Sequence, residues 1–156
     1  LKWVEAQRKL NSEISKVCEG IVDKAIKMKS LLCIDSVTGG QKMGTFGQGD
    51  IIKNLQTMCE NSSVPFYVVP CRNTSRRCAS CGHVAKENRT DTDNFECVDC
   101  GYKCNAQQNG ADNIAHQGSR MYNAGVPYGN WAKRNVDKLV KEYSQQQSSV
   151  DTSETS

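Results

Sequence analysis

The sequence contains no apolar run long enough to cross a membrane as a helix. Such a span needs roughly 20 consecutive apolar residues, and the longest runs here are five residues or fewer, as in residues 66–69. Aromatic residues are few, at 6%, and the net charge of +3 is too small to indicate a polyanionic partner by itself. These absences exclude a helical membrane protein. They leave one domain, or one domain with an insert and a tail, as the expectation for 156 residues.

The start of the chain lacks both a methionine and a secretory signal. It begins with Leu1 and enters a helical pattern without the charged and apolar regions of a signal peptide. We therefore expect the chain to be a fragment of a longer polypeptide.

Cysteine is abundant, with nine residues. The number is odd, so the cysteines cannot all pair with one another within one chain. Five of them are scattered among apolar neighbours, where cysteine behaves as a small apolar residue. The pattern favours a reducing, intracellular compartment.

The N-terminal part of the chain alternates helical and extended patterns. Residues 1–29 are expected to form one long helix, because apolar residues recur at three- and four-residue intervals: Trp3, Leu10, Ile14, Val17, Ile21, Ala25 and Met28. Residues 31–35 are typical of a short buried strand that ends in the carboxylate of Asp35. A glycine-rich loop is expected over residues 36–49.

A second helix and a second strand follow this loop. The helix is expected over residues 50–60, with Asp50 as its N-cap, and the strand over residues 66–69 between two prolines. The order helix, strand, helix, strand predicts an α/β sheet covered by helices.

The rest of the chain changes character twice. Residues 71–104 have no helical periodicity, and a short strand is expected within them over 94–96. Residues 105–118 again have a helical pattern. A basic stretch over 119–143 is expected to contain a short helix. The tail over 144–156 should be disordered, because it has too few apolar residues to offset its ordering entropy.

The strongest motif is a pair of Cys-x-x-Cys turns separated by 15 residues, each followed by glycine. Such a turn directs two thiolates at one metal, and two turns joined by a hairpin form a closed tetrahedral sulfur site that suits structural Zn²⁺. The predicted ligands are Cys78, Cys81, Cys97 and Cys100. We leave His83 and Cys104 out of the site because four thiolates complete the shell. The alternative is that these cysteines are core residues or redox pairs.

The two cysteine pairs are followed by a second specific motif. It reads Asn105-Ala106-Gln107-Gln108-Asn109-Gly110-Ala111-Asp112-Asn113-Ile114. Together, residues 74–114 resemble the C-terminal zinc-ribbon and RuvC segment of the transposon-encoded RNA-guided nucleases of the TnpB group and of type V CRISPR effectors. The resemblance implies an α/β fold of RNase H-like (RuvC) type, present as a sheet fragment with helices and an inserted four-cysteine zinc ribbon.

The resemblance also implies a Mg²⁺-dependent nuclease site built on three carboxylates, which would activate water for strand cleavage. The first carboxylate lies upstream of this chain. The second matches Asp35, where the family usually has Glu. The third is an Asp in the family and matches Gln107 here. A neutral amide cannot supply the charge that Mg²⁺ sites use, so we expect a vestigial site, with Mg²⁺ bound only if the site is active.

Function is therefore expected to be nucleic-acid binding. The resemblance implies guide RNA and target DNA as partners. We expect no membrane partner and a cytoplasmic, nucleoid-associated protein that is prokaryotic or phage-encoded. Phosphate contacts are predicted for Arg72, Arg76, Arg77, Arg89, Lys103, Arg120, Lys133 and Arg134. Two alternatives stay open, an active Mg²⁺-dependent RuvC-type endonuclease and a free-standing zinc-ribbon factor associated with transcription.

These interpretations predict four segments. Residues 1–73 would be a RuvC-like α/β part and residues 74–104 the zinc ribbon. Residues 105–143 would form a C-terminal RuvC helix with a basic extension, and residues 144–156 the disordered tail.

Overall fold

The computed structural model describes residues 2–36 and 48–128, and these fall into two compact units. Of the described residues, the first unit contains 2–32, 48–67 and 127–128. The second contains 33–36 and 68–126. The predicted loop over residues 37–47, the basic extension beyond residue 128 and the tail all lie outside the described residues.

The first unit begins with α1, Lys2–Met28, as the periodicity predicts. The side chains it buries are Cys18, Val22 and Ala25, in its C-terminal half. Most of the predicted apolar set is solvent-accessible instead, with Trp3 75% and Val17 62% exposed. Periodicity shows that a helix is amphipathic, whereas burial depends on where α2 reaches along it.

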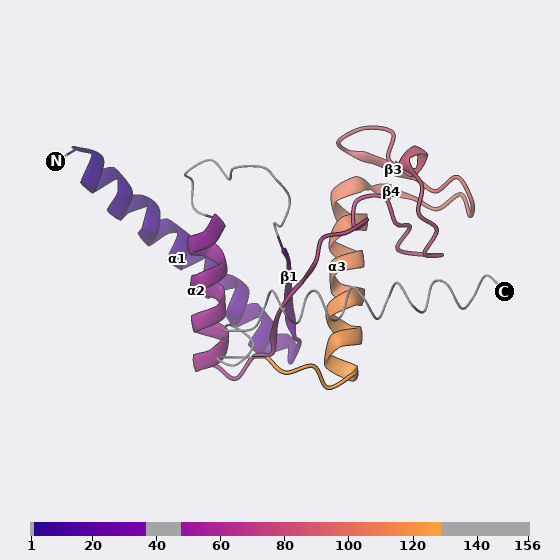
Figure 1. Cartoon of the computed structure of the whole chain (residues 1–156). Coiled ribbons are helices and arrows are strands. Elements are labelled where there is room, and N and C mark those ends of the chain that lie inside the picture. Colours follow the sequence, from indigo (N-terminus) through magenta and orange to yellow (C-terminus); the bar gives the residue numbers. More distant parts are fainter. Residues whose placement is uncertain (1, 37–47, 129–156) are drawn as a thin grey trace. The chain divides into compact units, whose positions relative to one another are not determined.

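Helix α2, Gln48–Asn61, packs against the C-terminal half of α1 (Figure 1). Its buried side chains include Leu55 and Cys59. The Cys18 thiol lies 3.9 Å from the carbonyl oxygen of Ile51, within reach of a weak hydrogen bond. The helix starts at Gln48, two residues before the predicted start. Asp50 therefore lies inside the helix, and its predicted role as the N-cap was wrong.

Strands β1, Leu32–Ser36, and β2, Phe66–Pro70, form a two-stranded sheet. The Leu32 N–H donates to the Pro65 carbonyl at 2.8 Å. Both strands match their predicted positions to within one residue. The boundary between the two units falls within both of these strands.

The second unit combines short extended segments with one helix. A 3₁₀ turn, η1 (Lys86–Asn88), is followed by β3 (Asn94–Glu96), β4 (Lys103–Asn105) and α3 (Ala106–Asn123). Strands β3 and β4, which are labelled in Figure 1, are antiparallel. Their register pairs Phe95 with Cys104. The strand over 94–96 is where the sequence predicts it.

Helix α3 runs five residues beyond its predicted end at residue 118. The additional turn buries Met121, an apolar residue on the same face as Asn113 and Gln117. The helix ends at Asn123. Gly125, just beyond the C-cap Ala124, has a φ of +71°, in the left-handed region that glycine adopts without strain. The sequence-based boundary was wrong because the buried face continues through polar residues that carry no hydrophobic signal.

The described residues confirm the mixed α/β class, with three α-helices and two two-stranded sheets. None of these helices is long and apolar enough to cross a membrane.

Candidate metal centre and its supporting helix

The four predicted cysteine ligands lie together at the ends of two turns. All four sulfur atoms are within 4.8 Å of one another. The Sγ atoms of Cys78 and Cys100 are 3.7 Å apart, and those of Cys81 and Cys97 are 3.6 Å apart. Zn²⁺ with Zn–S bonds of about 2.3 Å in tetrahedral geometry separates its sulfurs by about 3.8 Å. The donor set and its spacing therefore fit a structural zinc ion.

The two turns have the same backbone construction. We call residues 78–83 the first knuckle and residues 97–102 the second knuckle. In each, the first cysteine donates its N–H to the carbonyl five residues later and accepts the N–H of the glycine. The four bonds are 2.9 Å long: Cys78 N–H to His83 O, Gly82 N–H to Cys78 O, Cys97 N–H to Tyr102 O, and Gly101 N–H to Cys97 O.

Glycine is required at the same place in both knuckles. Gly82 has a φ of +82° and Gly101 a φ of +73°. Residues with a Cβ rarely adopt this left-handed conformation, whereas glycine adopts it at little cost. The glycine after each cysteine pair therefore allows the tight turn that brings both sulfurs to one point.

The pKa values of the cluster cysteines and the repulsion between their thiolates favour a bound cation. Hydrogen bonds from the backbone N–H groups of Cys100 and Asp99 lower the pKa of Cys97 to about 7. At Cys81 the His83 N–H acts in the same direction, but desolvation and the other three sulfurs outweigh it and raise the pKa of Cys81 to about 12. Four thiolates this close repel one another unless a cation neutralises them. A bound Zn²⁺ would supply that charge.

Within residues 2–36 and 48–128, the four cysteines are the only group of three or more His, Cys, Asp or Glu side chains placed to hold a metal ion. Cys104 instead packs, half-buried, against a small core formed by Phe95, Ala106 and two of the ligand cysteines. The His83 side chain is exposed and does not join the cluster. Neither residue belongs to the four-cysteine cluster in the described part of the chain.

A fully buried asparagine joins the two knuckles. The Nδ2 of Asn88 donates to the carbonyl oxygens of Arg76 at 2.9 Å and His83 at 3.1 Å. Its Oδ1 accepts the N–H of Val98, in the second knuckle, at 3.0 Å. Asn88 thus provides a partner for the Arg76 carbonyl and the Val98 N–H, and a second donor for the His83 carbonyl, which also accepts the Cys78 N–H.

Two asparagines of the second motif attach α3 to the first knuckle. Asn109, fully buried, donates to the Arg77 carbonyl at 2.8 Å and accepts the Ala79 N–H at 3.0 Å. Asn113, one turn later, donates to the carbonyls of Thr74 at 3.0 Å and Arg77 at 2.8 Å. The regular spacing of these asparagines places each of them on the side of α3 that faces the cysteine turn, so their role is structural. The sequence analysis did not predict this role.

Gln107 lies on the exposed side of the first turn of α3. Asn105 caps the helix and accepts the N–H groups of Gln107 at 2.9 Å and Gln108 at 3.2 Å. The Gln107 side-chain amide donates to the Thr92 carbonyl at 3.4 Å. Asp112 faces another direction, where it accepts a hydrogen bond from Gln108 at 2.8 Å. Gln107 therefore uses its side-chain amide as a hydrogen-bond donor to a neighbouring loop, at the N-terminus of α3.

Asp35, the other residue predicted for the nuclease site, lies half-buried in β1. It belongs to no group of three metal-ligating side chains within the described part of the chain.

Comparison with known proteins finds relatives that match the region containing the four cysteines. Residues 49–114 match the family described as Cas12f1-like, TNB domain. The putative RNA-guided DNA endonuclease InsQ of Escherichia coli (strain K12) is 51% identical over 57 residues, 36% of this chain and 14% of InsQ. The CRISPR-associated endodeoxyribonuclease Cas12f1 of Sulfoacidibacillus thermotolerans is 31% identical over 129 residues, 78% of this chain and 26% of that protein.

Solved structures share the fold. The cryo-EM structure of a Cas12f1–sgRNA–target DNA complex matches with a TM-score of 0.63 at 20% identity, over 71% of this chain and 34% of that one. CasPhi-2 (Cas12j) bound to crRNA and phosphorothioate-DNA matches with a TM-score of 0.59 at 18% identity, over 77% of this chain and 19% of that one.

The chain carries a Cas12f1-like TNB region. This region is related to the corresponding parts of the TnpB-type protein InsQ and of the Cas12f1 effectors, which confirms the resemblance inferred from the sequence. The chain spans about a quarter or less of the length of these two relatives. The second motif, over residues 105–114, lies at the C-terminal end of the TNB match.

The predicted phosphate-binding residues of the TNB region and its flanks have different surroundings. Arg72 and Arg76 are exposed. Lys103 pairs with Glu96 at 3.0 Å on the surface, where such pairs contribute little stability. Arg89 donates to the carbonyls of Asp91 and Thr92, both at 3.1 Å, so part of its guanidinium holds its own loop. Lys133 and Arg134 lie outside the described residues.

Two of the predicted arginines lie in one notch. Arg77 and Arg120 line the same polar notch in the second unit although they are 43 positions apart in sequence. His116, which sequence reasoning set aside as an ordinary helix histidine, lines it as well. The available signal was the four-residue spacing of His116 and Arg120, which places them on one face of a helix.

Proposed function

We propose that this chain is the C-terminal part of an RNA-guided DNA-binding protein of the TnpB and Cas12f group, and that it binds nucleic acid without cleaving it. The family membership of residues 49–114 supports the group. The names of the two relatives, a putative RNA-guided DNA endonuclease and a CRISPR-associated endodeoxyribonuclease, support guide-directed DNA as the partner. The zinc ribbon would act structurally, since a closed four-thiolate shell leaves no open position for catalysis.

The observation that carries the inactive assignment is the residue at position 107. The resemblance inferred from the sequence implies a carboxylate there, and this chain has Gln107, whose amide donates a hydrogen bond to a backbone carbonyl. A two-metal nuclease site needs carboxylates to hold two cations about 3.5–4 Å apart. Replacing one by an amide removes a negative charge from that site and should suppress turnover.

An active endonuclease is the second candidate. It is favoured by the names of both curated relatives and by Asp35, which keeps an acid on β1. In either case we propose the division inferred from the sequence, with a RuvC-like part over 1–73, the ribbon over 74–104 and the C-terminal helix with its extension from 105.

The two candidates predict opposite results for Gln107→Asp. The test uses the full-length polypeptide with its guide RNA, a matching DNA target and Mg²⁺ or Mn²⁺. The natural sequence is expected to bind without cutting, while Gln107→Asp restores a carboxylate and produces measurable cleavage. We expect a difference of at least about a hundredfold in rate, because even indirect support of a metal ligand is worth 10–100-fold.

Gln108→Asp is the matched control, since it adds the same charge one position along the helix, beside Asp112. It should remain inactive. Efficient cleavage by the natural sequence, abolished by Asp35→Ala, would overturn the inactive assignment.

A further inference from the structure

A polar notch of about 490 Å³ lies between the first knuckle and α3, within the second unit. Arg77 and the knuckle residues 78–82 form one wall, and five residues of α3 between Asn113 and Arg120 form the other. Both walls carry a basic side chain, and no Asp or Glu is among the described residues that line the notch. Such a lining favours an anionic ligand.

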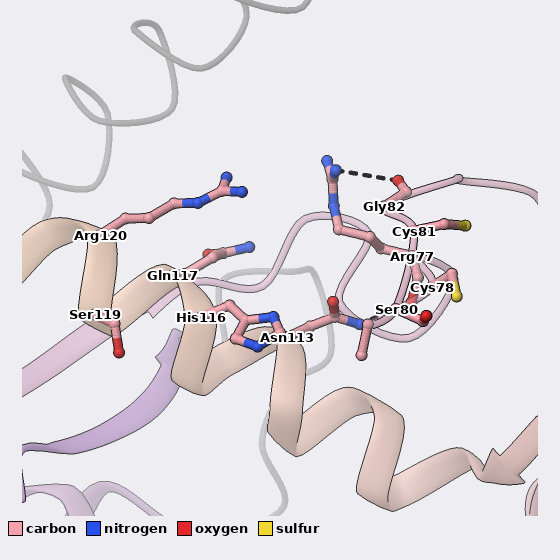
Figure 2. Close-up of a pocket in the computed structure, with 11 residues that line it drawn as sticks. Arg77, Cys78, Ser80, Cys81, Gly82, Asn113, His116, Gln117, Ser119 and Arg120 are labelled. Carbon is pink, nitrogen blue, oxygen red and sulfur yellow. Dashed lines mark hydrogen bonds between the residues drawn. The ribbon is translucent and has the colours of Figure 1, made fainter. Parts of the chain in front are cut away.

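The two guanidinium groups approach the notch from opposite walls. Figure 2 shows Arg120 extending from α3 toward the turn that carries Arg77. The Arg77 Nη1 donates to the Gly82 carbonyl at 3.3 Å, which holds that side chain over the turn while other donors stay available. Arg120 is exposed and forms no ion pair with a described residue.

The helix wall also carries groups suited to a nucleobase. His116 is exposed one turn before Arg120, and an imidazole ring can stack on an unpaired base. Gln117 is only 7% exposed, and its Oε1 has no hydrogen-bond partner among the described atoms. Figure 2 shows the Gln117 side chain extending toward the Arg77 turn. A ligand N–H would satisfy this oxygen, which is otherwise costly to leave buried.

The volume of the notch exceeds what a phosphate group alone requires and is within the range of small-ligand sites. We propose that the notch holds one unpaired nucleotide of a bound nucleic-acid strand. Its phosphate contacts Arg77 and Arg120, its base lies against His116, and a base N–H is directed at Gln117. This assignment rests on the proposed nucleic-acid-binding function and locates one contact within it.

A competing explanation is that the arginines only balance the zinc centre. Zn²⁺ with four thiolates has a formal charge of −2, and Cys78 and Cys81 border the notch. This explanation predicts that removing one of the two notch arginines weakens zinc retention. The affinity for a single strand would then fall no more than in a variant that lacks an arginine elsewhere on the surface. The nucleotide assignment predicts a specific loss of single-strand affinity.

The test uses the zinc-loaded 156-residue chain and a fluorescent single-stranded oligonucleotide of about 12 nucleotides, within the usual site size. Affinity is measured by anisotropy over a series of salt concentrations, with the same sequence as a duplex and AMP as competitors. The variants are Arg120→Ala and His116→Ala. Arg8→Ala, which removes an exposed arginine from α1, is the matched control.

Arg120→Ala is expected to weaken single-strand binding about three- to tenfold and to reduce the log–log salt slope by about 0.7, the value for one phosphate contact on a single strand. His116→Ala should weaken binding about fivefold or more without changing the slope, because it removes stacking rather than charge. The duplex should compete poorly, and AMP should not displace the strand at concentrations where unlabelled oligonucleotide does.

Different failures point to different errors. If the natural chain binds no oligonucleotide, the proposed function fails. If it binds, but Arg120→Ala and His116→Ala match Arg8→Ala, the nucleotide assignment alone is wrong. Faster zinc loss to a chelator in Arg120→Ala with unchanged strand affinity would support charge balance instead. Displacement by AMP as effective as by the oligonucleotide would assign the notch to a free nucleotide and overturn the strand assignment.

Discussion

Replacing Cys97 with serine is expected to abolish stoichiometric zinc binding and to unfold the segment that carries the two knuckles. The purified natural chain should contain one equivalent of zinc, and Cys97→Ser close to none after dialysis against a chelator. Structural Zn²⁺ sites contribute about 10–16 kcal/mol of apparent binding free energy, most of which is free energy of folding. The loss should therefore be large.

The structure explains why the rest of the segment cannot compensate. Its core within the described residues consists of Cys78, Phe95, Cys97 and Ala106, with Tyr102 and Cys104 packed at its edge. Two of the four core members are ligands, and β3 and β4 have three residues each. So little apolar area cannot order both knuckles by itself, as in other small domains that depend on a metal.

Metal analysis and the dispersion of amide resonances measure this effect. Cys104→Ser is the matched control, because this thiol lies beside the core and outside the cluster. It should keep one zinc equivalent and folded resonances. Full zinc occupancy in Cys97→Ser, or equal loss in Cys104→Ser, would show that the ligand set is wrong.

Asn88→Ala is expected to destabilise the zinc-loaded ribbon by about 3 kcal/mol or more. The substitution removes a partner from two carbonyls and one N–H. One of the carbonyls, that of His83, keeps the Cys78 N–H, while each of the other two groups, left unsatisfied, costs about 1–3 kcal/mol. These two are the carbonyl of Arg76 and the N–H of Val98. Because the contacts link both knuckles, local opening of the cluster should become more frequent.

Hydrogen exchange at the Val98 amide reports this opening directly, since its N–H donates to Asn88. Protection should fall by a factor of about 100 or more, the equivalent of about 3 kcal/mol. Zinc transfer to a chelator should be faster as well. Asn123→Ala, at the exposed end of α3, is the control and should change neither quantity measurably. A Val98 protection factor unchanged in Asn88→Ala would contradict the linking role of Asn88.

Local patterns in the sequence identified most of the elements. Helical periodicity located α1 to within one residue at each end, and paired prolines located β2. These features depend on neighbours within one or two turns of the chain, which a single sequence displays. The burial of α1 did not follow, because it depends on where another helix ends along it, and Trp3 and Val17 are exposed despite their apolar spacing.

The zinc ligands could also be predicted from the sequence. The Cys-x-x-Cys spacing and the following glycine define a turn by local stereochemistry, and Gly82 and Gly101 have the positive φ that this turn requires. The pairing of the turns needs only a short hairpin between them. Sequence alone therefore determined which four thiols meet, and the structure places their sulfur atoms within 4.8 Å of one another.

The roles of the asparagines and the notch depended on tertiary structure. Asn109 contacts Ala79 across 30 positions and Asn113 contacts Thr74 across 39. Arg77 and Arg120 come together only because these contacts dock α3 on the first knuckle. A polar residue in a helix carries no local sign of whether it faces solvent or satisfies a distant backbone group. The chain's local chemistry determined the metal ligands and the helix, while the long-range docking of α3 decided which of its polar side chains support the fold and which remain free to bind.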